Sequence, residues 1–279
     1  PIEAMEKQLR KAYRQGHDIQ LHIHPQWVNA RWTKNGWRVD KDKWRLGGYE
    51  EDNEEALTDL LNQGKVTLEK ILGDKEYECI ALRAGGYNIQ PSRMLIKAMR
   101  KVGLKSDSSV VPGAKETGKL SRYDYTSADK TLGLWYCEEK LEVAARNQTD
   151  IVELPIVALP LLRLQKYLSF DRIKSILRNR ISAKETFEAK IETKGQRGGI
   201  ISKMRYFFQY ETQTWDFCLF SKYLHRKFLK SIKEQRERKV FTLIGHPKSL
   251  TSSDGLAYLI EQLQGSYSFT TVSNYVKTL

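Results

Sequence analysis

The chain repeats one pattern along most of its length. A short apolar run ends in polar or glycine residues and is followed by a loop or an amphipathic helix. Residues 19–24 form the first such run, and later runs lie at residues 78–83, 104–111 and 239–246. Hairpin signals are few, so this order favours parallel strands joined by crossover helices. The sequence therefore predicts an α/β fold whose polar clusters lie at the carboxyl edge of a mainly parallel sheet.

The composition is typical of a folded globular protein. Hydrophobic residues make up 40% of the 279 residues, which argues against intrinsic disorder. No apolar run approaches the roughly 20 residues that a membrane-spanning helix needs. The three cysteines, Cys79, Cys137 and Cys218, are far apart and odd in number, which is typical of free thiols in a reducing compartment. We therefore expect a cytoplasmic protein.

Most of the net charge of +13 belongs to one segment. Residues 161–239 contain 20 Lys and Arg against 8 Asp and Glu, and the rest of the chain is nearly neutral. This segment is too long for a simple connection, and it predicts a basic, largely helical insertion within a single domain of residues 1–279. Its helices either carry a solvated basic face or lie on an anionic membrane, which would put the protein at the inner membrane face. Nucleic acid is a weaker expectation, because the motifs of common nucleic-acid-binding folds are absent.

Two histidines lie two residues apart in the first strand. Because side chains alternate along a strand, the apolar residues of the run 19–24 share one face, and His22 and His24 share the other. Adjacent imidazoles of this kind are potential ligands of a divalent metal, most often zinc. A half-buried strand with two hydrogen-bonded histidines explains the same spacing.

Four of the six tryptophans follow directly, between residues 27 and 44. An indole ring in a loop either packs the loop onto the protein body or forms a flat apolar wall for a ligand ring such as a sugar. We expect Trp27 and Trp32 to contact a substrate, with loop packing as the alternative.

Several of these motifs resemble those of the polysaccharide deacetylases, carbohydrate esterase family four, in their order and overall spacing. Residues 16–25 resemble the family's histidine motif, residues 83–87 resemble its Arg-x-Pro-Tyr motif, and residues 243–247 resemble its late Leu-x-His motif. The Asp-Ser-Ser-Val run at 107–110 and the Glu-Leu-Pro run at 153–155 match the branch associated with surface-polysaccharide biosynthesis.

The resemblance implies a distorted (β/α) barrel with one divalent metal, usually zinc. Such enzymes remove an acetyl group from an amino sugar, here of a surface polysaccharide or its lipid-linked precursor, by metal-assisted hydrolysis. Carried over by position, His22 and His24 would be metal ligands and His246 would be the general acid. Arg83 would tether the catalytic carboxylate, and Tyr87 would help to form the oxyanion site.

The likeness departs from the family pattern in three places. The family spaces its two histidines four residues apart, and Gln26 occupies that position here. The motif at residues 83–87 is one residue longer and lacks the proline, and we expect its Gly85 and Gly86 to let a substrate approach the backbone. The family's catalytic base and metal aspartate belong to the first strand of the barrel, which we expect to lie upstream of Pro1.

Asp107 is the nearest carboxylate within the chain that could replace this base, although an Asx-type turn before Ser108 and Ser109 explains it equally. Two functions therefore stay open. One is a metal-dependent deacetylase acting on an acetylated glycan. The other is an inactive protein of the same fold that binds glycan or glycan-assembly partners. A third interpretation, a basic adaptor for membranes or nucleic acid, depends on residues 161–239 alone.

Overall fold

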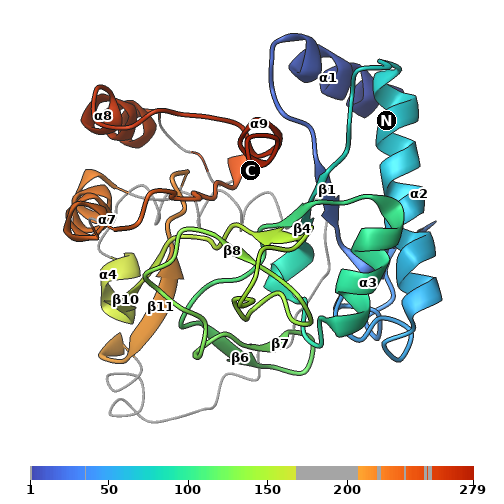
Figure 1. The fold of residues 1–279 in the computed structure, drawn as a ribbon, viewed down its shortest axis with the longest axis horizontal. Coiled ribbons are helices and arrows are strands. Elements are labelled where there is room, and N and C mark those ends of the chain that lie inside the picture. Colours follow the sequence, from blue (N-terminus) through green and yellow to red (C-terminus); the bar gives the residue numbers. More distant parts are fainter. Residues whose placement is uncertain are drawn as a thin grey trace. The chain divides into compact units, whose positions relative to one another are not determined.

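The computed structural model describes residues 2–34, 36–167, 207–218, 221–235, 237–247, 250 and 253–279. The protein is a mixed α/β structure with a parallel-strand sheet (Figure 1). The chain divides into two compact units. Unit 1 comprises Pro1–Val28, Asp40–Pro155 and Ser268–Leu279, and unit 2 comprises Asn29–Val39 and Ile156–Tyr267.

The central sheet of unit 1 has five strands in the order β1-β4-β5-β9-β8. Their bounds are Leu21–Ile23 for β1, Ala81–Ala84 for β4, Ser106–Asp107 for β5, Val152–Glu153 for β9 and Trp135–Tyr136 for β8. The first four strands are parallel, and β8 pairs with β9 in the antiparallel direction. The predicted parallel α/β organisation is confirmed.

Three helices accompany this sheet, namely α1 (Ile2–Arg14), α2 (Glu54–Leu72) and α3 (Arg93–Val102). Helices α2 and α3 lie beside each other to the right of β4 in Figure 1 and contact one another. The side chain of Asn53 caps α2 by accepting a hydrogen bond from the Ala56 amide at 3.0 Å, and Gly73 ends the helix in the left-handed conformation.

Glycine commonly ends a helix, so the sequence predicts that a helix ends at Gly64, yet α2 continues through this residue. A Cβ at this position would lie 2.8 Å from Cδ1 of Leu21 and 3.7 Å from Cδ1 of Ile23. The glycine therefore serves close packing between α2 and β1. Since Leu21 and Ile23 face α2, the side chain of His22 lies on the opposite, exposed face of β1, as the alternation predicted.

Unit 2 is built from short antiparallel strands and helices. Its elements are β2 (Arg31–Thr33), β3 (Gly36–Arg38), β10 (Ala158–Leu162), α4 (Arg163–Tyr167), β11 (Tyr210–Thr214), α7 (Lys222–Glu234) and α8 (Asp254–Leu263). Its core surrounds Trp215, whose Nε1 donates a hydrogen bond to Nδ1 of His225 at 3.0 Å. Leu224 and Phe228 from α7 and Leu259 from α8 belong to the same core.

Several local predictions were wrong. The run at 239–247, expected to be a strand, forms only isolated bridges, from Thr242 to Ile156 and from Ile244 to Asp216. The sequence pattern at residues 269–272 predicts a further short strand, but the helix α9 (Val272–Val276) begins there. Residues 113–135 are rich in Gly, Ser, Thr, Asp and Tyr, which predicts a long loop, but they contain the hairpin of β6 (Lys115–Thr117) and β7 (Arg122–Asp124).

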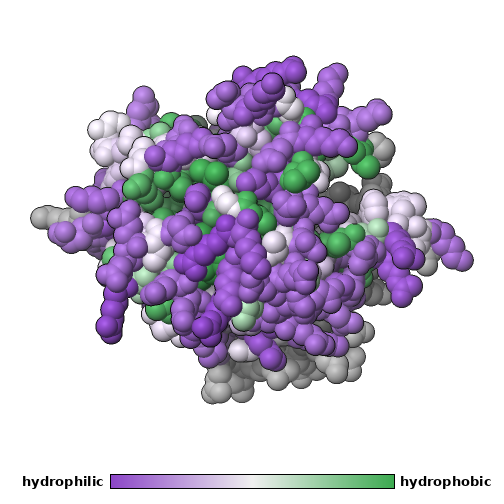
Figure 2. All heavy atoms as spheres, turned by 45° about the vertical axis from the view of Figure 1, so that its right-hand side comes forward, coloured by the Kyte–Doolittle hydropathy of each residue, from purple (hydrophilic) through white to green (hydrophobic). Residues whose placement is uncertain are grey.

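Much of the predicted basic insertion, residues 168–206, lies outside the described residues. The described remainder includes α7, which buries Leu224, Phe228 and Leu229 in the core of unit 2. Helix α7 therefore packs its apolar side chains into the core of unit 2 and carries its Lys and Arg side chains on the outer side. None of the helices in the described ranges is long and apolar enough to cross a membrane. Figure 2 shows a mostly hydrophilic face on which hydrophobic side chains are exposed in separate groups.

Candidate functional site

The two histidines of β1 point their Nε2 atoms at each other. Nδ1 of His22 lies 2.7 Å from the carbonyl oxygen of Arg83, so this nitrogen carries the hydrogen and donates it. The Nε2 atom of His22 therefore holds a lone pair, and it lies 3.1 Å from Nε2 of His24. Two ligands of a tetrahedral zinc ion are separated by about 3.3 Å when each bond is about 2.0 Å. The spacing therefore suits two ligands of one ion.

Gln26 contacts the imidazole of His24 at Nδ1, whereas Nε2 of this ring faces His22. Nε2 of the Gln26 amide lies 3.3 Å from Nδ1 of His24, and its Oε1 is buried with no hydrogen-bond partner in the described part of the chain. In this orientation Nδ1 of His24 accepts a hydrogen bond, and Nε2 donates to His22. If the amide of Gln26 turned over, its Oε1 would accept from Nδ1, and Nε2 of His24 would hold a lone pair for a metal. Gln26 can thus select the tautomer of His24.

The imidazole of His24 lies directly on the backbone of Gly85. A Cβ added at position 85 would come within 2.6 Å of Cγ and 2.7 Å of Cε1 of this ring. Any other residue at position 85 would therefore displace the imidazole. The first glycine of the pair is buried and supports the histidine, whereas Gly86 is exposed.

The turn after β4 contains two successive left-handed residues. Gly86 has φ 60°, and Tyr87 has φ 64°, a conformation that is unfavourable for a side chain with a Cβ. The hydroxyl of the buried Tyr125 donates a hydrogen bond to the carbonyl oxygen of Tyr87 and holds it there. Asn88, also buried, donates from Nδ2 to the carbonyl oxygen of Gly86 at 3.0 Å.

Arg83 is the register partner of His22 on the neighbouring strand. Its guanidinium is half-buried, and within the described ranges it makes no hydrogen bond or ion pair. Burial lowers the pKa of Arg83, and the nearby Tyr87 and Asp107 oppose this effect. A half-buried cation with no ion-pair partner favours binding of an anionic group beside the histidines.

Two carboxyl groups face each other in the middle of the sheet. Asp107 on β5 and Glu153 on β9 are register partners, and both are 0% exposed. Burial disfavours the charged form, so it raises the pKa of Asp107 to about 6 and raises the pKa of Glu153 well above its ordinary range. The negative charge of Asp107 raises the pKa of Glu153 further, so one of the two groups holds a proton.

The surrounding donors decide which carboxyl holds this proton. Asp107 accepts from the amide of Ser109 at 2.9 Å and from Oγ of Ser109 at 2.8 Å. Because Oγ of Ser109 accepts from the Ala84 amide at 2.8 Å, its only hydrogen is directed to Asp107. Oε1 of Glu153 accepts from the Val110 amide at 2.9 Å, and Oε2 receives no donor from the described residues. The proton therefore belongs on Oε2 of Glu153.

The hydrogen bond from the Ser109 amide to Asp107 is the Asx-type turn that the sequence allowed as an alternative. Asp107 has no exposed surface, so it is placed to fix the loop after β5. Glu153 was not predicted as a site residue. The signal that could have found it is a single acidic residue within the otherwise apolar run at residues 151–156.

His246 lies in unit 2 and forms a pair with a buried aspartate. Its Nδ1 lies 2.6 Å from Oδ2 of Asp216, whose Oδ1 accepts from the Cys218 amide at 3.0 Å. The Asp216 side chain is buried, whereas the imidazole is partly exposed. The carboxylate therefore keeps the hydrogen on Nδ1 and leaves Nε2 for another partner. Sequence reasoning missed Asp216, although an acidic residue directly after the buried Trp215 was a signal.

The tryptophans expected to bind substrate are exposed. Trp27 ends the short 3₁₀ helix Pro25–Trp27 of unit 1, and Trp32 lies on the hairpin of unit 2. Trp32 is 67% exposed and makes an edge-to-face contact with Trp37, with ring centroids 5.5 Å apart. The prediction did not include Trp37, which pairs with Trp32 across β2 and β3.

Comparison with models of known protein families gives no match, and no curated protein and no solved structure matches the chain. Among the described residues, no group of three or more His, Cys, Asp or Glu side chains is arranged to hold a metal ion. Within this part of the chain, the metal prediction therefore has two converging nitrogen ligands and no third.

We expect Glu153→Gln to stabilise the protein increasingly as the pH rises. When folding raises the pKa of a carboxyl group, the protonated group stabilises the folded protein. This contribution has its full value below the pKa of the group in the unfolded chain, near 4.3 for Glu, and it is lost as the pH rises through the pKa of the folded state. The amide of Gln mimics the protonated Glu153 and does not titrate. Urea unfolding between pH 5 and 8 should show the free energy of unfolding of the variant rising relative to that of the wild type. The gain should be about 1.4 kcal/mol for each unit by which folding raises the pKa of Glu153.

Asp107→Asn is the matched control for this experiment. The amide nitrogen of Asn cannot accept from the two donors of Ser109 as the carboxylate does, so the variant should be about 1–3 kcal/mol less stable than the wild type at pH 8, where Asp107 of the wild type is ionised. Equal destabilisation by both substitutions at pH 8 would show that the proton does not belong to Glu153.

We expect Gly85→Ala to displace the imidazole of His24 while the strand pairing persists. The added Cβ overlaps this ring, and overpacking of this kind costs about 1–3 kcal/mol. Long-range proton–nitrogen NMR spectra of the imidazoles should show His22 protonated at Nδ1 in the wild type and a changed His24 signal in the variant. Gly86→Ala, strained at its own φ, should lower the melting temperature and leave the His24 signal in place. Unchanged His24 signals in Gly85→Ala would contradict the proposed contact.

Proposed function

We propose that the chain is a metal-dependent deacetylase with the (β/α) barrel of the polysaccharide deacetylases. Its substrate would be an acetylated amino sugar of a surface polysaccharide or of its lipid-linked precursor. The observation that supports this most strongly is the convergence of two histidine Nε2 atoms on a strand that pairs in parallel with the strand of the half-buried Arg83. His22 and His24 would hold one zinc ion, which polarises an acyl carbonyl and activates water when bound.

The residues around the histidines would orient the reacting groups. Arg83 would hold the catalytic carboxylate, as the resemblance implies, because it is the register partner of His22 and its guanidinium has no ion pair in the described ranges. Tyr87 and the exposed Gly86 would present the backbone of the turn to the acyl oxygen. We assign Asp107 a positioning role in place of the base role, because it is buried and bonded to Ser109.

The proton for the leaving amine would come from His246. Asp216 accepts from Nδ1 of this residue, so Nε2 is the nitrogen that would exchange a proton with the substrate. The exposed rings of Trp27 and Trp32 would stack on sugar faces, and Trp37 would add to the second of these surfaces.

A second candidate function is an inactive protein of the same fold that binds glycan or glycan-assembly partners. The observation that favours it is that the described residues bring no third metal ligand to the histidine pair. The two functions differ in metal content and in acetate release.

We expect the purified full chain to bind about one zinc ion per molecule, with His22→Ala weakening zinc binding at least tenfold. Removal of one of two converging ligands leaves the ion with a single nitrogen from this cluster. Metal analysis and competition titration with a chelator would measure both proteins. His17→Ala, at an exposed histidine outside the cluster, is the control and should keep the full zinc content. Equal zinc content in all three proteins, or none, would contradict the ligand role of His22.

We expect Asp216→Asn to reduce the rate of acetate release from oligomers of N-acetylglucosamine by about 10²–10⁴-fold, the range for loss of general acid–base catalysis. The substitution removes the acceptor that orients His246. Acetate would be measured in an enzyme-coupled assay, with zinc content and melting temperature as controls for an intact protein. A wild-type chain that binds these oligomers and releases no acetate would support the second function instead.

A further inference from the structure

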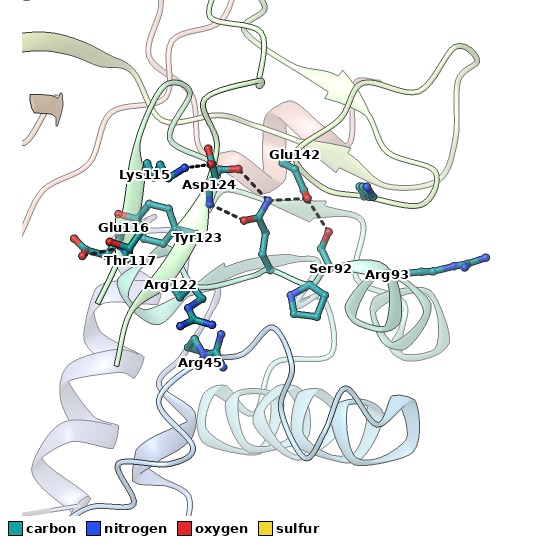
Figure 3. A pocket seen from close by; sticks show the side chains of 13 residues that line it. Arg45, Ser92, Arg93, Lys115, Glu116, Thr117, Arg122, Tyr123, Asp124 and Glu142 are labelled. Carbon is teal, nitrogen blue, oxygen red and sulfur yellow. Dashed lines mark hydrogen bonds and ion pairs between the residues drawn. The ribbon is translucent and has the colours of Figure 1, made fainter. Parts of the chain in front are cut away.

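A cavity of about 620 Å³ opens in unit 1, away from the histidine pair (Figure 3). The hairpin of β6 and β7 forms one wall, and the residues Gln90–Arg93 before and at the start of α3 form another. Arg45, Lys140 and Glu142 complete the lining. Its volume lies within the range of about 300–1,000 Å³ that is typical of ligand pockets. None of the residues proposed above for catalysis, metal or substrate binding lines it.

Each of the three acidic residues that line this cavity is engaged within the protein, and Oε1 of Glu116 accepts from the amides of Thr117 and Gly118 at 3.1 Å each. Glu142 accepts from Nε2 of Gln90 at 2.8 Å and from Oγ of Ser92 at 2.7 Å, as the dashed lines in Figure 3 show. Asp124 forms an ion pair with Lys115 at 2.6 Å. These contacts fix the walls and neutralise part of their negative charge.

Two arginines of the same cavity have no such partners. Within the described ranges, the guanidinium groups of Arg45 and Arg122 make no hydrogen bond and no ion pair, and Figure 3 shows both on the same side of the cavity. Arg45 is half-buried. Two neighbouring cations repel each other in the absence of a counterion, and a bound anion would relieve this repulsion.

The backbone that carries both arginines is held by one buried residue. The Arg122 amide donates to Oδ1 of Asn88 at 2.9 Å, and the amide of Leu46, next to Arg45, donates to the Asn88 carbonyl oxygen at 3.1 Å. Asn88 is 0% exposed. The backbone segments that carry Arg45 and Arg122 are therefore both hydrogen-bonded to the buried Asn88, and this preorganises the two residues for one ligand.

We propose that this cavity binds the phosphate group of a phosphate ester such as a sugar phosphate, with Arg45 and Arg122 as its ligands. One guanidinium satisfies a carboxylate through two parallel hydrogen bonds, whereas two guanidiniums match the greater charge and the three oxygens of a phosphomonoester. The cavity is larger than a phosphate ion, so it has room for the esterified group. The half-buried ring of Tyr123 supplies an apolar wall for that group.

The test uses the full chain and glucose 1-phosphate as the probe, measured by calorimetry at low ionic strength. We expect the wild type to bind glucose 1-phosphate at least tenfold more tightly than glucose or acetate, and binding should weaken as salt is added. The double variant Arg45→Gln/Arg122→Gln should lose at least tenfold in affinity. The control Arg31→Gln/Arg38→Gln removes the same charge from the exposed hairpin of unit 2 and should bind as the wild type does.

Loss of affinity in both double variants alike would overturn the site, because it would show a response to net charge alone. Equal affinity for acetate and glucose 1-phosphate would overturn the phosphate assignment. If the double variant of the cavity does not fold, the single variant Arg122→Gln, at an exposed side chain, gives the same comparison. None of these outcomes bears on zinc content, so this site and the proposed deacetylase function are tested separately.

Discussion

Hydrogen bonds link the buried Asp107 through Ser109 to the amide of Ala84, and they connect β5 with β4 at the centre of the sheet, where the protonated Glu153 of β9 is the register partner of Asp107. In a buried, low-dielectric environment each of these polar groups is costly unless it is satisfied, so the linked groups allow one arrangement. Ala84 lies directly before the glycine turn. The start of that turn is therefore held by Ser109, which is itself held by the carboxylate of Asp107.

The histidine pair depends on the same turn. His24 lies against Gly85, and His22 donates to the carbonyl oxygen of Arg83, so each imidazole is oriented by backbone of β4 or of the turn that follows it. Backbone contacts of this kind hold a side chain more firmly than contacts with flexible side chains do. The resulting edge combines two converging nitrogens with a half-buried cation. These are groups that can bind a metal and an anion in close proximity.

Local patterns predicted those parts of the fold that depend on short-range periodicity. The alternation in residues 19–24 correctly predicted the buried and exposed faces of β1. Apolar residues at helical spacing near residues 3–13, 92–101 and 253–264 likewise predict helices, where α1, α3 and α8 form. One error arose because a glycine was assigned its commoner role. Gly64 is a typical helix end, yet here it gives β1 room against α2. The Lys115–Asp124 hairpin carries no strong turn signal, and its second strand is held by side chains distant in sequence, because the amides of Arg122 and Asp124 donate to Asn88 and Gln90.

The sequence by itself determined the parallel α/β organisation, the face of β1 that carries the histidines and the polar clusters that follow the strands. These follow from side-chain alternation and helical periodicity, which are properties of neighbouring residues. Only the tertiary structure decided the proton on Glu153, the tautomer of His22, the pairing of His246 with Asp216 and the two arginines of the cavity. Each of these depends on burial or on contact between residues 30 or more positions apart, and protonation follows from the desolvation and the donors that such contacts create.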